Sequence, residues 1–264
     1  MSMDSLEIIV TGRGSDVSND FPEPILIPTD YEAKIGLKRF STYNNIPNIT
    51  KGVNNQLKIR VPGGKYSVFS LETGAYELEV IAEQMIEWIG MSNPKLQAKD
   101  KFRLIGNNAT SKADFYFLDD YGVDFNVDAS MHVLLGFDKT DKFEGIGRYV
   151  GKRIVSITNV TQLIFNCNIS TSNYISGREM PFLYNCSIDV PAGYRLAREL
   201  TDIVYKTLTT TQISHIRIWI VDEHGVPVNL RDDDLAVTLS LKLKRRVIPV
   251  SLCDDDTESA SRGA

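Results

Sequence analysis

The sequence predicts an all-β protein, an antiparallel β-sandwich of the single jelly-roll type with an inserted helical and loop segment and one or two short helices. Short runs rich in Val, Ile, Thr and aromatic residues recur along the chain, separated by Gly, Pro, Asn and Asp. Helical periodicity is rare. No segment of 20–50 residues repeats, which argues against solenoids and propellers. About eight strands suffice for a jelly roll, so the remaining ones are expected in loops.

About eleven segments have the composition and alternation of strands. In the segment 31–40, Ala33, Ile35 and Leu37 fall on one side and mostly charged residues on the other, which predicts one buried and one solvated face. The predicted strands are 7–11, 31–40, 56–61, 66–71, 102–105, 114–118, 153–158 with 162–167, 182–188, 203–207, 215–221 and 236–243.

The segments 215–221 and 236–243 show the clearest alternation. Isoleucines occupy every second position of the first, and Val or Leu every second position of the second. A turn at 223–225 separates them. We expect two neighbouring strands with an elaborated connection, both central in the sandwich.

Two segments depart from the β pattern. From Tyr76 to Trp88, apolar residues recur at steps of three and four, and Gly90 and Pro94 follow, which predicts a helix of about three turns. The apolar stretch 129–135 precedes Gly136 and predicts a second helix of about two turns.

The domain boundaries follow from composition. Residues 1–20 and 252–264 are expected to be a flexible N-terminal arm and a flexible acidic C-terminal tail, because polar segments gain too little from burial to offset their ordering entropy. A jelly-roll domain at 21–251 lies between them, with an insertion at about 72–148. The alternative is a sandwich plus a small α+β subdomain built from that insertion.

Composition excludes several function classes. With 29 Lys and Arg against 34 Asp and Glu, the net charge of −5 disfavours binding to nucleic acid. No apolar run is long enough for a membrane span, and no export signal is visible, so we expect an intracellular protein.

The residues that carry enzyme chemistry show no catalytic or metal-binding spacing. The three cysteines, Cys167, Cys186 and Cys253, are too far apart for a zinc site, and the three histidines have no second ligand nearby. Phosphate-loop and nucleophile-elbow motifs are absent from the sequence. We therefore expect no enzyme, no cofactor and no metal, although a pair of carboxylates brought together in space stays open.

Five blocks of sequence carry a family resemblance, and the last two are the most specific. They are GGKY (63–66), LETGAYEL (71–78), IVSITNV (154–160), HIRIWIVDEHG (215–225) and NLR (229–231). In order and spacing these blocks resemble the minor capsid (penton) proteins of Polinton/Maverick elements and adintovirus-like viruses, over roughly residues 55–243. The resemblance implies a single jelly roll that forms homopentamers at the vertices of an icosahedral capsid, with no catalytic residues.

The resemblance also implies partners. They are other copies of the chain, the major capsid protein and a vertex spike or receptor, with no membrane and no specific nucleic acid, in a virion assembled inside the host cell. Trp219, Arg217 and Trp88 are candidate subunit-interface residues, because Trp and Arg are enriched at interface hot spots. The alternative for each Trp is coverage by its own chain.

Two other functions remain as alternatives. One is a carbohydrate- or receptor-binding sandwich that uses Tyr116, Tyr121 and Tyr174, since the same architecture serves lectins. The other is a hydrolase built on scattered carboxylates.

Overall fold

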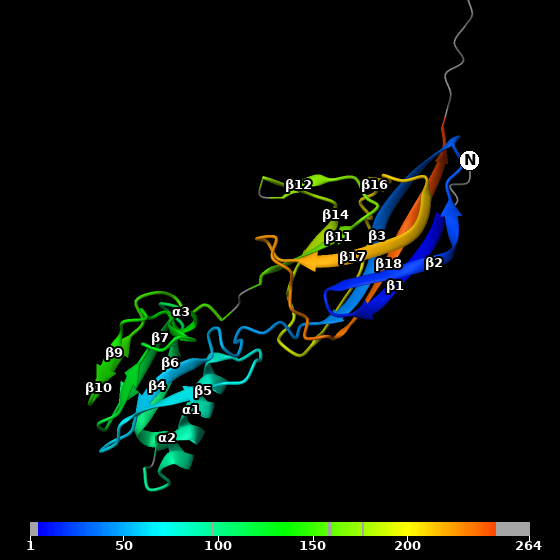
Figure 1. Cartoon of the computed structure of the whole chain (residues 1–264). Coiled ribbons are helices and arrows are strands. Elements are labelled where there is room, and N and C mark those ends of the chain that lie inside the picture. Colours follow the sequence, from blue (N-terminus) through cyan, green and yellow to red (C-terminus); the bar gives the residue numbers. More distant parts are fainter. Residues whose placement is uncertain (1–4, 97, 158–159, 176, 247–264) are drawn as a thin grey trace, which may run out of the picture.

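The computed structural model describes residues 5–96, 98–157, 160–175 and 177–246. They form two units with separate hydrophobic cores (Figure 1). We call them the sandwich and the inserted unit. The inserted unit follows the third strand of the sandwich and precedes the fourth.

The sandwich consists of two antiparallel sheets. In the first sheet the order is β1 (Ser5–Arg13), β18 (Asp234–Arg245), β3 (Tyr31–Tyr43) and β15 (Arg195–Glu199), and β16 (Lys206–Thr207) also pairs with β3. In the second sheet it is β14 (Phe182–Ser187), β11 (Gln162–Cys167), β17 (Gln212–Val221) and β2 (Asp16–Leu26). A hairpin of β12 (Asn173–Ile175) and β13 (Arg178–Met180) lies outside both sheets.

The strand order identifies the jelly roll. Numbered along the chain without β16 and the β12–β13 hairpin, the eight sandwich strands are ordered 1-8-3-6 in one sheet and 5-4-7-2 in the other. Two Greek keys wound together give this order. The inner faces of both sheets form one core, in which the Phe40 and Phe165 rings lie 4.5 Å apart between centroids.

The inserted unit is an α+β unit. One sheet is β5 (Tyr66–Ser70), β4 (Gln56–Arg60), β8 (Gly122–Asp124) and β9 (Lys142–Glu144), and the other is β10 (Gly147–Val150), β7 (Lys112–Phe117) and β6 (Phe102–Asn107). Its helices are α1 (Leu78–Ser92), α2 (Ala98–Lys101) and α3 (His132–Leu135). Stacked and edge-on phenylalanines fill its core, which spans Ile49 to Phe137.

The predicted all-β class is confirmed, and both predicted helices form, although α3 has four residues and not the two turns expected over 129–135. The buried face of α1 consists of the residues whose spacing predicted it, and these are Leu78, Ile81, Ala82, Met85 and Ile89. Gly136 ends α3 in the left-handed conformation at φ 77°.

The inserted segment differs from the expected 72–148, because the predicted strands 56–61 and 66–71 belong to the inserted unit and not to the sandwich. The alternative of a sandwich plus an α+β unit therefore matches the structure better. Alternation along a strand shows which face is buried but not which sheet receives it. No strand forms at 153–157, and only Lys206–Thr207 of the predicted 203–207 pairs with a neighbour.

The N-terminal segment also differs from the expected arm. Residues Ser5–Arg13 and Asp16–Leu26 form β1 and β2, and Ile8, Val10 and Val17 are buried in the sandwich core. Few apolar residues were enough here, because every second side chain faces the core. The predicted tail at 252–264 lies outside the described residues.

The two most regular strands, β17 and β18, are central as predicted, but they are not neighbours. β17 pairs with β11 and β2, whereas β18 pairs with β1 and β3 in the opposite sheet. The segment between them passes from one sheet to the other. The apolar faces of both strands point into the same core between the sheets.

Candidate subunit-contact surfaces

Arg217 and Trp219 lie next but one to each other on the outer face of β17. The Arg217 Nε and Nη2 atoms donate to the two carboxylate oxygens of Asp16 at 2.8 and 2.5 Å. The guanidinium also lies over the Trp219 ring, 5.2 Å from its centroid. About half of each side chain of the ion pair is exposed, so the pair is held in place but remains accessible.

This surface carries a second side-chain contact along the same seam between β17 and β2. His215 Nδ1 lies 2.8 Å from Asp20 Oδ1. The hydrogen bond from Arg217 lowers the pKa of Asp16, and the same bond raises the pKa of Arg217. The seam therefore presents one ion pair and one hydrogen-bonded His–Asp contact beside an aromatic ring.

Trp88 lies elsewhere, on α1 of the inserted unit. Its ring is half-buried and meets the Phe69 ring edge-on at 6.0 Å between centroids. Of the three predicted contact residues, the structure therefore brings Arg217 and Trp219 together and places Trp88 in a different unit.

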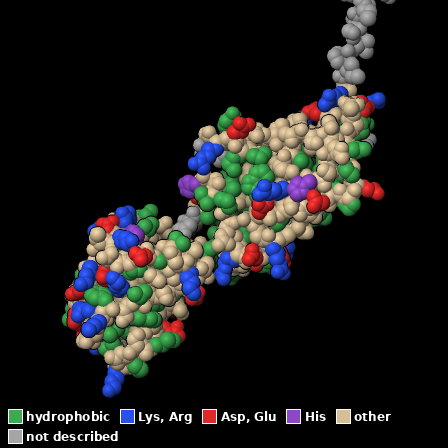
Figure 2. Space-filling view, viewed as in Figure 1, with side chains coloured by type: hydrophobic (Ala, Val, Ile, Leu, Met, Phe, Trp, Pro, Cys, Tyr) green, Lys and Arg blue, Asp and Glu red, His purple; other side chains and the backbone are tan. Residues whose placement is uncertain are grey.

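Charged side chains of both signs are interspersed on the face that Figure 2 shows, without a continuous field of one sign.

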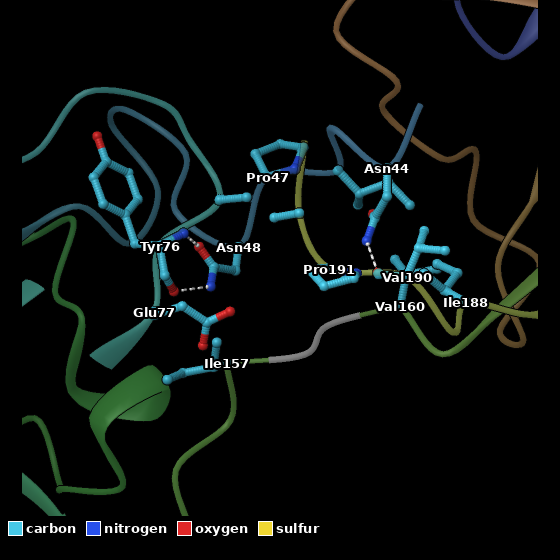
Figure 3. A pocket seen from close by; sticks show the side chains of 13 residues that line it. Asn44, Pro47, Asn48, Tyr76, Glu77, Ile157, Val160, Ile188, Val190 and Pro191 are labelled. Carbon is cyan, nitrogen blue, oxygen red and sulfur yellow. Dashed lines mark hydrogen bonds between the residues drawn. The ribbon is translucent and has the colours of Figure 1, made fainter. Parts of the chain in front are cut away.

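The junction of the two units is a site that the sequence did not indicate. Asn44 Nδ2 donates to the Val190 carbonyl at 2.8 Å on the sandwich side. Asn48 donates to the Tyr76 carbonyl at 2.7 Å and accepts from the Tyr76 amide at 2.9 Å on the other side. A pocket of about 180 Å³ lies between these anchors, with Ile157 on its wall (Figure 3). The two asparagine side chains at this pocket hydrogen-bond to backbone groups, so they hold neighbouring segments of the chain in position.

Glu223, from the loop after β17, holds the start of β11, where the chain returns from the inserted unit to the sandwich. Its carboxylate accepts from Thr161 Oγ1 at 2.7 Å and from the Thr161 and Gln162 amides at 3.2 and 3.3 Å. Burial alone would raise the pKa of Glu223, but these hydrogen bonds outweigh burial and lower it. We call this arrangement the Glu223 clamp.

The nucleophiles and metal ligands are dispersed. Within the described residues, no three His, Cys, Asp or Glu side chains are grouped to hold a metal ion. Cys167 and Cys186 are buried, and burial raises the pKa of each thiol to about 11, so both are protonated at neutral pH. His132 and His224 also lie apart from these thiols, on α3 and in the loop after β17. No helix of the described chain has the length and apolarity of a membrane span.

The tyrosines of the carbohydrate-binding alternative are separated. Tyr121 is completely buried, in contact with Phe102, and cannot stack on a ligand. Tyr116 lies under the Arg148 guanidinium, whereas Tyr174 is 75% exposed on the β12–β13 hairpin. This arrangement removes one of the three predicted contacts and gives no shared platform to the other two.

No family model matches the chain, and no curated protein sequence matches it. Among solved structures, the chain is similar to the selenomethionine-labelled mavirus penton protein, with a TM-score of 0.47 and 11% sequence identity. The similarity covers 92% of this chain and 100% of that one. The jelly-roll assignment rests on the strand order of the two sheets.

Proposed function

We propose that this chain is a minor capsid (penton) protein that forms homopentamers at capsid vertices and contacts the major capsid protein. The observation that carries the proposal is the complete 1-8-3-6 and 5-4-7-2 strand order with a separate unit inserted between the third and fourth strands. The order leaves two edge strands in each sheet, β1 and β15 in one and β14 and β2 in the other, so the flanks of the sandwich differ. A ring requires such different flanks, because each contact in it is heterologous.

The family blocks support the same proposal through their positions. The most specific block, at 215–225, forms the second half of β17 and the start of its connection, including Trp219 and the Glu223 clamp. It therefore covers part of the exposed β17–β2 seam and the residue that holds the start of β11. We infer that Arg217 and Trp219 contact the neighbouring subunit, and that Trp88 makes a separate contact through the inserted unit.

Mass photometry of the purified full chain over a range of protein and salt concentrations tests the ring. The expected result is a species of five times the 29.6 kDa chain mass, whose population rises with concentration. Monomer alone at all concentrations and salts would count against the homopentamer.

Co-expression with a candidate major capsid protein, followed by electron microscopy, tests the vertex position. We expect closed particles with density for this chain at the five-fold vertices. Particles whose vertices lack that density, from a preparation that contains the chain as a pentamer, would refute the vertex role and leave the ring intact.

A further inference from the structure

A short protrusion interrupts the edge strand β2 of the second sandwich sheet. Residues 21–24 of β2 lie opposite the single residue Ser214 of β17, so the surplus residues bulge out of the sheet edge. Three members of this bulge, Pro22, Glu23 and Pro24, are exposed. We call residues 22–24 the edge knob.

The edge knob is held in shape by its flanks and by its own backbone. Phe21 and Ile25, on either side of it, pack partly buried against the sandwich core. Each proline fixes its φ angle, so the knob loses little conformational freedom when it docks. Asp20, the acid nearest to the knob along the strand, contacts His215, whereas Glu23 has no ion pair within the described chain. The knob therefore presents one unengaged carboxylate between two apolar rings.

A groove with unengaged positive charge lies on the outer face of the first sheet. Its floor is the cross-strand row of Ala236, Ser41 and Ala197 on the adjacent strands β18, β3 and β15. Two adjoining hollows of about 430 and 700 Å³ lie over this floor, and Arg195 lines both of them. Arg39 lines the smaller one. We call this the outer groove.

The two arginines Arg39 and Arg195 have no carboxylate partner within the described chain. Arg39 Nε donates to Thr238 Oγ1 at 3.0 Å, and Arg195 Nε donates to Ser41 Oγ at 2.9 Å. The terminal nitrogens of both guanidinium groups remain open to an acceptor from outside, and both residues are exposed. Two guanidinium groups beside a floor of small side chains match a carboxylate that is flanked by compact apolar rings.

The acids near the outer groove do not neutralise these two arginines. Four arginines and two acids line the hollows, so the lining has a net charge of +2. Two of the four arginines already pair with carboxylates, Arg13 with Asp234 and Arg198 with Asp189. The remaining acid, Glu199, lies opposite Arg39 in register but forms no ion pair with it. The groove therefore favours an acidic occupant.

The edge knob and the outer groove belong to different sheets of the sandwich. β2 is an edge strand of the second sheet, whereas the groove lies on the first, and no knob residue lines the groove of its own chain. A contact between them therefore joins two copies through different surfaces, as a closed ring requires. The knob also lies on β2 just beyond the contact between Asp20 and His215, so it continues the β17–β2 seam that we assign to the subunit contact.

We propose that the edge knob of one copy docks in the outer groove of the next, with the Glu23 carboxylate on the Arg39 and Arg195 guanidinium groups. The prolines of the knob lie on the floor of small side chains. This inference rests on the homopentamer of the proposed function and names the two surfaces that meet in it.

Charge reversal tests the pairing in the full chain by mass photometry. The variants R39E/R195E and E23R are each expected to lower the pentamer population about tenfold or more, because each places like charges together. The combined variant E23R/R39E/R195E restores opposite charges and should recover most of the pentamer. R103E, which changes an exposed arginine of β6 on the inserted unit, is the matched control and should leave the population at the level of the parent protein.

Cysteine pairs test the contact directly, in a C253S background in which the other two cysteines are buried. Ala197→Cys and Pro24→Cys are made in separate chains, mixed while monomeric, concentrated and treated with a short bis-maleimide. The mixture is expected to give covalent dimers, whereas either variant alone gives none, because groove does not meet groove and knob does not meet knob. Val133→Cys, exposed on the inserted unit, replaces Pro24→Cys in the control mixture and should not cross-link.

The outcomes separate the docking from the ring. Parent pentamers that ignore the charge reversals, a combined variant that stays folded but does not recover, or a mixture that does not cross-link would each overturn the docking and leave the ring intact. A parent protein that stays monomeric at all concentrations would refute the ring, and this contact with it.

Discussion

At the scale of single residues, Arg217 is expected to contribute to association between subunits and little to the stability of the fold. About half of its side chain is exposed, and ion pairs of this kind contribute about 0–1 kcal/mol to folding. We therefore expect Arg217→Ala to change the free energy of unfolding by less than about 1 kcal/mol and to lower the pentamer population in mass photometry about tenfold or more. Arg103→Ala is the matched control on an exposed arginine of β6 for which the described residues show no ion pair.

The same measurement decides the two tryptophans. Trp219→Ala should act as Arg217→Ala does, because the two side chains stack. Trp88→Ala tests the separate contact of the inserted unit, and it also removes the edge-on contact with Phe69. A pentamer population that stays at the level of the parent protein in Arg217→Ala and Trp219→Ala would remove the β17–β2 seam from the interface.

Two glycines with the same backbone angle give a matched pair of substitutions. Gly136 and Gly52 have φ of 77° and 79°, where an alanine costs about 1–2 kcal/mol. A Cβ atom at Gly136 would also meet the Arg153 carbonyl oxygen at 2.3 Å, whereas Gly52 has open space. Urea unfolding should therefore show a larger loss for Gly136→Ala than for Gly52→Ala, by more than about 1 kcal/mol. Equal losses of unfolding free energy in the two variants would mean that the backbone at Arg153 moves aside at little cost.

At the scale of elements, the local sequence determined whether a segment became a helix or a strand and which of its faces is buried. Which strands pair with one another depended on the whole chain. α1 was predictable because its five buried residues repeat at helical spacing. β2 was not, since Pro22 and Pro24 interrupt its pattern. The prolines are tolerated because β2 is an edge strand, and they fall where its register with β17 shifts between Ile213 and His215.

The candidate contact residues were likewise predictable in their face but not in their partners. Arg217 and Trp219 are two positions apart on a predicted strand, so their common face was predictable. The Asp16 partner was not, because it comes from a strand 201 positions away in a segment expected to be a flexible arm. The Glu223 clamp likewise joins the loop after β17 to the start of β11, and the loop residue carries no periodic signal.

The Glu223 clamp predicts a local, pH-dependent effect. Hydrogen bonds to a charged group contribute about 1.5–3 kcal/mol, so Glu223→Gln should speed amide exchange at Thr161 and Gln162 about tenfold. The folded pKa of Glu223 is below its ordinary value of 4.5, so the carboxylate stabilises the clamp above that pH and loses its effect as pH falls through the folded pKa.

Exchange rates of the parent protein and the variant should therefore differ above about pH 4.5 and converge below the folded pKa. Glu79→Gln, on the exposed face of α1, is the control. A ratio that does not vary with pH would assign the anchoring to shape and not to charge.

At the scale of the whole molecule, the chain has two cores that share no strand ladder among the described residues. The sandwich closes with β1, β2 and β3 before the inserted unit and five strands after it, while the inserted unit is continuous in sequence. Such units often open separately, because few buried contacts link them. The junction pocket between the Asn44 and Asn48 anchors lies where the two cores would otherwise be joined.

This arrangement predicts that damage to one core stays local. Phe137 is fully buried and stacks on Phe125 at 5.0 Å, and Ile218 is fully buried in the sandwich. Phe137→Ala should cost about 3–5 kcal/mol and Ile218→Ala about 2–5 kcal/mol. In hydrogen exchange followed by mass spectrometry, Phe137→Ala should lower protection in β4–β10 and α1 while the sandwich strands keep theirs, and Ile218→Ala should do the reverse. Equal loss of protection across both units in either variant would mean that the junction couples them into one cooperative fold, and the inserted unit could then not move or be exchanged independently of the sandwich.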